Sequence, residues 1–191
     1  KLRENNLPVK HISVVGDDED ELVMLLKEAF RRSQILITTG GFGPTEDDIT
    51  FQSVARAFNL DLVKYPEAEK HMNKILTSVN VGISQSNLKQ AYLPRGSHCI
   101  INRYGTAPAI ILEIDNQIII SLPGVPLEMK KLMSEEIIPF LCQKFPSLKH
   151  SQSRIIRLSG IGESTVNEII KDFIHQNKKL DIGLYANPQD I

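Results

Sequence analysis

The feature that most constrains this chain is an apolar run that leads into a glycine-rich loop and then into a helix pattern. Ile35–Thr39 is apolar without alternation, which is typical of a strand buried on both faces of a parallel sheet. Three glycines follow within residues 40–43, and apolar residues at helical spacing begin after Asp48. This order predicts an α/β layer fold with a ligand site beyond the carboxyl end of the strand.

Other patterns extend the same order along the first 145 residues. An apolar run at 9–15 (VKHISVV) predicts a strand, and a helix is expected over 18–30 with Asp18 as its cap. Strand, helix, strand and helix in succession favour a parallel crossover. Further helices are expected at 48–58, 66–78 and 127–145, and further strands at 99–102, 109–114 and 117–122, the last two joined by a turn at Asp115-Asn116.

A polar stretch after Pro146 predicts a boundary between two units of the 191-residue chain. We expect a first domain over residues 1–147 and the start of a smaller α/β unit over residues 151–191. The smaller unit is too short to bury a core alone. Its expected elements are a strand at 154–158, a helix at 163–175 with Val166, Ile169, Ile170 and Phe173 inward, and a strand at 181–185.

The composition limits the classes of partner and the compartment. Lys and Arg number 22 against 23 Asp and Glu, so no global basic field favours nucleic acid. No apolar run approaches the roughly 20 residues that a membrane-spanning helix needs. Two cysteines cannot form a disulfide framework and suit a reducing compartment. We therefore expect a cytoplasmic protein that binds neither nucleic acid nor a membrane.

The glycine loop itself (TTGGFGPTEDDIT, residues 38–50) is the strongest candidate site. Its glycines allow positive φ and a close backbone approach, so that amide groups can converge on a phosphate, and the next helix adds its positive dipole end. The loop matches neither the dinucleotide fingerprint nor the Walker A motif. The alternative is an ordinary turn in which Asp48 or Thr50 caps the helix.

Asp47 and Asp48 beside a phosphate site predict a divalent cation, because two carboxylates would otherwise repel the phosphate. Asp17 follows the expected strand 9–15 and would join them from a parallel neighbour. Oxygen ligands suit Mg²⁺, Mn²⁺ or Co²⁺. Loops at 103–108 and 122–126 offer more free amides and the Thr106 hydroxyl, although each alone is more often an ordinary turn.

The segments TTGGFGPTEDDIT, SNLKQAYLP, NRYGTAP, LPGVPLEM and SGIGES occur together in one order. In this the chain resembles the N-terminal region of the CinA (competence/damage-inducible protein A) family, within the molybdopterin-binding domain superfamily. The resemblance implies a three-layer α/β/α sandwich with a mostly parallel sheet, followed by a truncated KH-like unit. It also implies that the domain's first strand and helix are missing from this chain. Phe42 stands where leucine is usual.

The resemblance further implies an activity and a site. The activity is hydrolysis of the pyrophosphate bond of ADP-ribose or a related dinucleotide, with Mg²⁺, Mn²⁺ or Co²⁺, K⁺ as a second ion, and no organic cofactor. Asp48, Asp17 and Asp47 would be the catalytic and metal-binding residues. Substrate-binding residues would be Thr39, Gly40, Gly41, Gly43, Thr45, Asn87, Lys89, Gln90, Gly105, Thr106, Pro123 and Gly124. A homo-oligomer, dimer or trimer, is expected.

Two other functions remain open at this point. The first is a non-catalytic module that binds a nucleotide or molybdopterin. The second is a transferase that adenylates molybdopterin, which would typically carry Arg-Asp where this chain carries Asp47-Asp48. The acidic pair favours the hydrolase.

Overall fold

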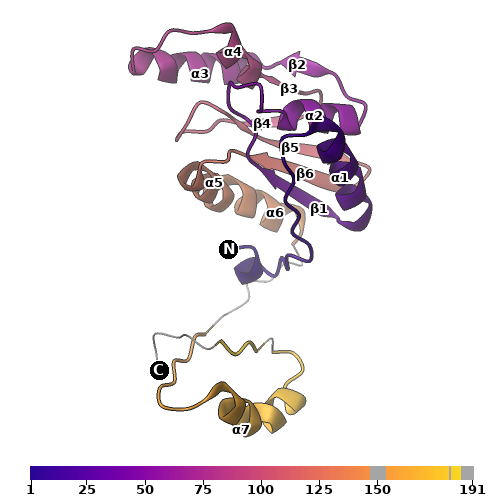
Figure 1. Ribbon diagram of the computed structural model, residues 1–191, viewed down its shortest axis with the longest axis vertical. Helices are drawn as coiled ribbons and strands as arrows, with labels where there is room; N and C mark the ends of the chain where they lie inside the picture. Colours follow the sequence, from indigo (N-terminus) through magenta and orange to yellow (C-terminus); the bar gives the residue numbers. More distant parts are fainter. Residues whose placement is uncertain (147–153, 181, 186–191) are drawn as a thin grey trace. The chain divides into compact units, whose positions relative to one another are not determined.

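The computed structural model describes residues 1–146, 154–180 and 182–185. The chain forms two units, Lys1–Ser151 and Gln152–Ile191. The first unit contains a four-stranded sheet of order β1-β6-β5-β4 and a two-stranded sheet of β2 and β3 (Figure 1). The strands are β1 (Ile35–Thr39), β2 (Leu62–Lys64), β3 (Tyr92–Pro94), β4 (His98–Ile100), β5 (Ala109–Ile114) and β6 (Gln117–Leu122).

Helices connect and cover these strands. They are η1 (Arg3–Asn5), α1 (Glu19–Arg32), α2 (Thr50–Ala57), α3 (Pro66–Ser78), α4 (Gln85–Leu88), η2 (Lys89–Ala91), α5 (Pro126–Leu132), η3 (Met133–Ile137), α6 (Ile138–Lys144) and, in the second unit, α7 (Glu163–Gln176). In the part of the chain that the structure describes, none of these helices is long and apolar enough to cross a membrane.

The main sheet is mixed, so the prediction of a mostly parallel sheet is wrong. β1 pairs with β6 in parallel, whereas β5 pairs antiparallel with both β6 and β4. Connection length explains the difference, because a parallel pair needs a crossover of a dozen or more residues. β5 and β6 are joined only by Asp115 and Asn116, whose φ values of 47° and 65° suit the predicted tight hairpin turn.

β1 lies at one end of the sheet order and is half-buried, not enclosed on both sides as its apolar sequence suggested. The predicted strand at 9–15 is absent, and these residues run as coil between η1 and α1 (Figure 1). Ile12 and Val14 are 85% and 94% exposed. A strand forms only where a neighbour satisfies its backbone groups, and no strand among the described residues pairs with this segment.

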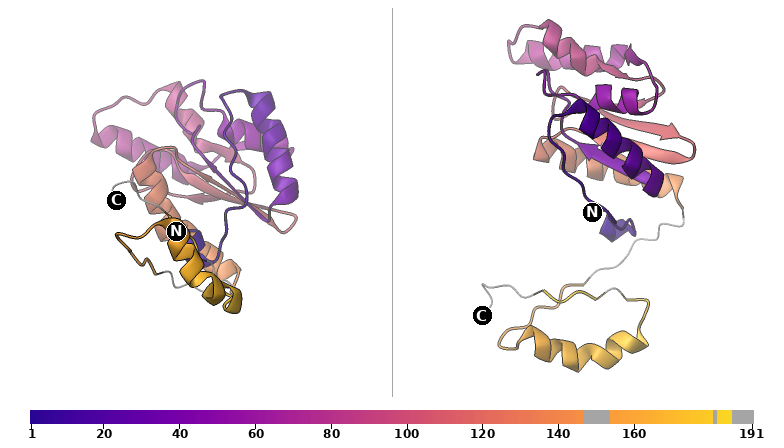
Figure 2. Two further views of the ribbon diagram at one scale, coloured as in Figure 1. Left: turned by 60° about the horizontal axis from the view of Figure 1, so that its bottom comes forward. Right: turned by 45° about the vertical axis from the view of Figure 1, so that its right-hand side comes forward.

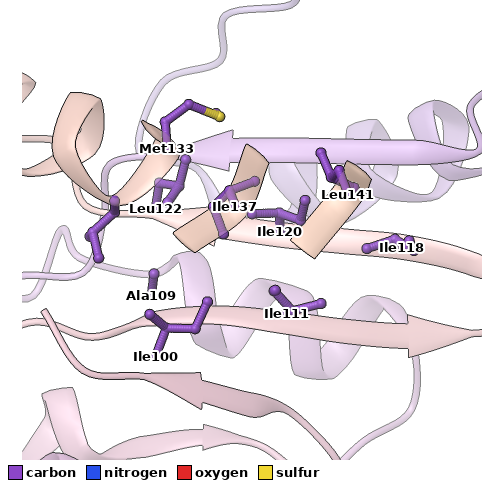
Figure 3. Packing of buried hydrophobic residues seen from close by; sticks show 10 residues of the cluster. Ile100, Ala109, Ile111, Ile118, Ile120, Leu122, Met133, Ile137 and Leu141 are labelled. Carbon is purple, nitrogen blue, oxygen red and sulfur yellow. The ribbon is translucent and has the colours of Figure 1, made fainter. Parts of the chain in front are cut away.

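Helices cover both faces of the main sheet (Figure 1 and Figure 2). On one face, Met133, Ile137 and Leu141 of the continuous helix 126–144 pack on β5 and β6 (Figure 3). On the other face, residues of α1 and α2 pack against Leu112 and Ile119. The alternation of Ile118, Ile119 and Ile120 between the two clusters follows the period of two in a strand.

The observed helix ends agree in part with those predicted from the sequence. Asp18 caps α1 as predicted, since its carboxylate accepts from the amide of Glu21 at 2.9 Å. The expected helix at 127–145 is observed over 126–144 with a π-helical stretch, η3, just before Pro139. Proline has no amide hydrogen, and a π turn is one way to accommodate the lost bond.

The second unit keeps its helix but not its strands. α7 forms as predicted, and Val166 is buried. The predictions that Ile169 and Phe173 point inward are wrong, because they are 68% and 52% exposed. Residues 154–158 and 182–185 form no strand, and residue 181 lies outside the described residues. The unit offers few neighbours to cover apolar side chains, as its length implies.

Stability of the first unit should depend on the centre of the sheet. We expect Ile119→Ala to lower the free energy of unfolding by about 2–5 kcal/mol, because Ile119 is fully buried and the substitution leaves a cavity. Ile12→Ala, at an exposed position, should change it by less than about 0.5 kcal/mol. Urea denaturation followed by circular dichroism measures both; equal losses would contradict the assignment of residues 9–15 to exposed coil.

Candidate functional site

Three loops meet at one edge of the main sheet. Thr39 pairs with Leu122 in parallel, so β1 and β6 end together. The antiparallel register brings the start of β5 and the end of β4 to the same edge. The glycine loop at 40–49, the loop at 101–108 and the loop at 123–125 therefore leave the sheet side by side, which is where α/β proteins bind ligands.

The glycine loop and the 123–125 loop are in direct backbone contact. The Gly40 amide donates to the Leu122 carbonyl at 3.0 Å, and the Thr39 hydroxyl donates to the Pro123 carbonyl at 3.0 Å. A Cβ on Gly124 would lie 3.1 Å from the Gly40 Cα. Glycine at position 124 thus allows an approach that a side chain there would crowd.

Thr50, which follows the glycine loop, forms hydrogen bonds back to the start of that loop. Its hydroxyl donates to the Gly40 carbonyl at 2.8 Å, and its amide donates to the Gly41 carbonyl at 3.2 Å. Gly40 and Gly41 both have positive φ, at 94° and 75°. α2 begins at Thr50 itself with Ile49 at the cap position and no side-chain cap, so neither Thr50 nor Asp48 caps this helix.

Asp48 closes a turn within the loop instead. Its Oδ2 accepts from the Thr45 amide at 2.9 Å and from the Thr45 hydroxyl at 2.7 Å. A Cβ on Gly43 would lie 2.4 Å from the same oxygen. Asp48 and Thr45, both predicted as site residues, are thereby brought together with Gly43.

Partial burial acts to raise the pKa of Asp48, but the Thr45 hydroxyl and amide, the Gly43 amide and the Lys89 charge outweigh it, so the pKa is lowered. A lowered carboxyl pKa adds stability above the ordinary pKa and loses it as the pH falls through the folded value. We expect Thr45→Val to move the pKa of Asp48 upward, because it removes one donor. A carboxyl-detected NMR titration measures this, and an unchanged Asp48 pKa in the variant would contradict the contact.

Lys89 and Gln90 hold the loop from the η2 side. The Lys89 ammonium donates to the Thr45 carbonyl at 2.8 Å, and the Gln90 amide donates to the Phe42 carbonyl at 2.9 Å. Asn87 belongs elsewhere, since its side chain completes a capping box with Ser84 at the start of α4. Two of the three predicted residues in this segment therefore reach the glycine loop.

A small pocket of about 180 Å³ lies behind the glycine loop. Phe42 and Phe51, stacked with their rings 4.3 Å apart, form part of its wall. Asp48 and Lys89 contribute opposite charges to the same lining. Its volume is below the range of about 300–1,000 Å³ that is usual for small-molecule pockets.

The loop at 101–108 is organised by Asn102, which is fully buried. Its side-chain amide donates to the Ala107 carbonyl at 2.9 Å and to the Glu128 carboxylate at 2.6 Å. The Tyr104 amide donates to its side-chain oxygen at 3.0 Å. These contacts fix the turn that carries Gly105 and Thr106, two predicted substrate-binding residues.

Asn102 and Glu128 were not among the predicted site residues. A signal for them existed, because Asn102 begins NRYGTAP and Glu128 lies within LPGVPLEM, two of the segments that define the resemblance. A Cβ on Gly105 would lie within 2.6 Å of the Glu128 carboxyl group, so Glu128 and Gly105 are in close contact. The contact between Gly105 and Glu128, which are 23 positions apart, cannot be derived from their spacing in the sequence alone.

The predicted metal ligands do not form a preformed centre. Asp17 is exposed beside the start of α1, where Asp20 pairs with Arg56 at 2.6 Å. Asp47 is exposed, and the carboxylate of Asp48 is turned to Thr45. Among the described residues, no three His, Cys, Asp or Glu side chains are placed to hold an ion. As folded here, this donor set does not fit a bound divalent cation.

Two family models match the chain. The model described as "Probable molybdopterin binding domain" matches residues 1–143, and the model described as "Damage-inducible protein CinA KH domain" matches residues 153–191. The first match covers most of the chain and the whole of the site described above.

Individual relatives agree with the family models. A "Putative competence-damage inducible protein" of Clostridium botulinum (strain Loch Maree / Type A3) is 39% identical over 188 residues, 97% of this chain and 45% of the relative. A "CinA-like protein" of Dictyoglomus thermophilum is 40% identical over 186 residues, with the same coverage. The chain thus spans about half the length of these relatives.

A solved structure is also similar. It is titled the crystal structure of the protein CinA with unknown function, from Thermoplasma acidophilum, and superposes with a TM-score of 0.56 at 33% identity. The match covers 64% of this chain and 72% of that chain.

Proposed function

Because the chain belongs to the CinA family, with a molybdopterin-binding-type domain followed by a CinA KH region, we propose that the edge described above binds and hydrolyses the pyrophosphate of ADP-ribose or a related dinucleotide. The observation that carries this proposal is a set of unpaired amides in the glycine loop and in the 123–125 loop that contacts it. Among the described residues, the amides of Gly41, Phe42 and Gly124 have no hydrogen-bond partner. Free backbone amides that lie close together in such loops can bind anions.

Phosphoryl transfer depends chiefly on positioning and on charge stabilisation, so a dedicated histidine base is not required. In the proposed reaction, a water oxygen bonds to one phosphorus and the bridging P–O bond breaks, giving AMP and ribose 5-phosphate from ADP-ribose. The glycine-loop amides would hold the phosphoryl oxygens as negative charge develops on them. The Lys89 ammonium, already within hydrogen-bond reach of the loop, would supply positive charge.

Asp48 has a positioning role in this proposal. Its lowered pKa keeps it ionised, which makes it a weak proton acceptor but a strong hydrogen-bond acceptor for the Thr45 amide and hydroxyl. It thereby holds the loop segment 43–48 in the shape that presents the free amides.

The test is an assay of AMP release from ADP-ribose, with Mg²⁺, Mn²⁺, Co²⁺ or a chelator in parallel arms. We expect AMP and ribose 5-phosphate in equal amounts in at least one arm, and none from a Gly41→Val protein. No AMP in any arm, from a protein that unfolds cooperatively, would overturn the proposed hydrolysis.

A non-catalytic binding module is the second candidate, favoured by one observation. The carboxylates that would hold an ion do not converge, and Asp48 is occupied by its own loop. Calorimetry distinguishes the two functions: saturable heat from ADP-ribose binding without AMP release identifies a binding module, and binding with release identifies the hydrolase.

A further inference from the structure

A second hollow, of about 380 Å³, lies between the later half of α3 and the segment that follows β4. It is lined by His71, Lys74, Ile75, Ser78, Ile101 and Arg103. Its volume falls within the usual range for small-molecule sites, unlike that of the pocket behind the glycine loop. None of the functional residues predicted from the sequence lines it.

The charged side chains of this hollow carry one sign. Lys74 and Arg103 make no ion pair among the described residues, and no carboxylate lines the hollow. The Arg103 charge also attracts the nearby carboxylate of Glu135. That carboxylate already accepts a hydrogen bond from the Tyr104 hydroxyl and pairs with Lys131 at 3.5 Å. Lys74 and Arg103 therefore give the lining of the hollow a net positive charge, while the Ser78 hydroxyl in that lining donates to the Ile75 carbonyl at 2.7 Å.

His71 links the hollow to the site loop. Its Nε2 lies 2.6 Å from the Asn102 carbonyl and 3.3 Å from the Gly105 carbonyl, and both are acceptors, so Nε2 carries the proton. This leaves Nδ1 without a partner among the described residues. The ring is thereby fixed by the backbone of the loop that presents Gly105 and Thr106.

The hollow also lies at the functional edge, because Ile101 and Arg103 belong to the connection from β4 to β5. We propose that it is a second anion subsite that binds a phosphomonoester or a comparable compact dianion through Lys74 and Arg103. Arginine and lysine are the side chains that pair with phosphate, and charge-assisted bonds are the strong ones. Through His71, an anion bound there is coupled to the loop at 102–106.

The experiment is calorimetric titration of the chain with ribose 5-phosphate and, as the matched control, with ribose. Ribose 5-phosphate is chosen because it is a product of the proposed reaction, so the choice of probe rests on the proposed function. The argument for an anion site in the hollow does not rest on that function. We expect ribose 5-phosphate to bind and ribose not to bind. Lys74→Gln and Arg103→Gln should each raise the Kd about tenfold, the usual effect of losing one charged hydrogen bond.

Two control variants locate the binding. Lys70→Gln, on the same helix but outside the hollow, and Lys27→Gln, at an exposed position on α1, should leave the Kd for ribose 5-phosphate unchanged. Circular dichroism and the urea midpoint establish that each variant is folded. Equal binding of ribose, or an unchanged Kd in both Lys74→Gln and Arg103→Gln, would overturn the proposal. Binding in the hollow without AMP release from ADP-ribose would overturn only the proposed hydrolysis.

Discussion

We expect Asp48→Ala to lower kcat for AMP release from ADP-ribose by about 100-fold or more, because misplacement of catalytic groups by about 1 Å has effects of this size. The substitution removes the acceptor of both the Thr45 amide and the Thr45 hydroxyl. It also removes the carboxylate against which Gly43 packs. The turn at 45–48 would then lose the contacts that shape the glycine loop.

Two further variants make this prediction specific. Asp48→Asn keeps a neutral acceptor for the Thr45 groups, so it should retain more activity than Asp48→Ala. Glu46→Ala, at an exposed position in the same loop, should keep the activity of the unmodified chain. Steady-state kinetics with AMP detection give kcat and KM separately. Full activity in Asp48→Ala would show that Asp48 has no role in the site.

The second large effect is expected for Gly41→Val, which should abolish ADP-ribose binding and cost about 2–4 kcal/mol of stability. Gly41 has φ of 75°, a conformation that a β-branched residue strongly resists. A Cβ there would lie 2.2 Å from the Thr50 hydroxyl, which holds the Gly40 carbonyl. The valine would therefore displace Thr50 and distort the free amides together.

Gly82→Val is the matched control, because no heavy atom lies within 4 Å of the added Cβ and φ there is not positive. It should change the stability by less than about 0.5 kcal/mol and leave ADP-ribose binding intact. Urea denaturation and calorimetry measure both quantities. Unimpaired binding in Gly41→Val would show that the glycine loop does not hold the ligand.

Local patterns predicted the elements whose structure depends on local contacts. The hairpin at 109–122 follows from two apolar runs around Asp115-Asn116, and the start of α1 follows from Asp18 and the acidic first turn. The short β2 and β3 were not predicted. Each has three residues, and they pair with one another across 30 positions, so nothing local marks them.

Predictions failed where the structure depends on a distant partner. Residues 9–15 have the composition of a strand, but no strand among the described residues lies beside them, so Ile12 and Val14 remain exposed. β1 was expected to be enclosed because its apolar run does not alternate. Its position in the sheet order depends on β6, which is about 80 residues away in sequence.

The same difference between local and distant contacts holds within the candidate site. Residues close together in sequence, such as Gly40 with Gly41 and Thr45 with Asp48, lie together in one loop. The grouping of Asp17 with Asp48 assumed that strand 9–15 would lie in parallel beside β1, and that strand does not form. The contact between Asn102 and Glu128 follows from the meeting of two loops at one edge and could not be read from either loop alone.

The most direct test of the account is the position of ADP-ribose on the domain, measured from amide chemical shifts of the ¹⁵N-labelled chain during titration. We predict saturable shifts that are largest at Gly41, Phe42 and Gly124, whose amides have no hydrogen-bond partner among the described residues. Saturable binding that leaves these three amides unmoved, with the shifts confined to residues 154–185, would contradict it.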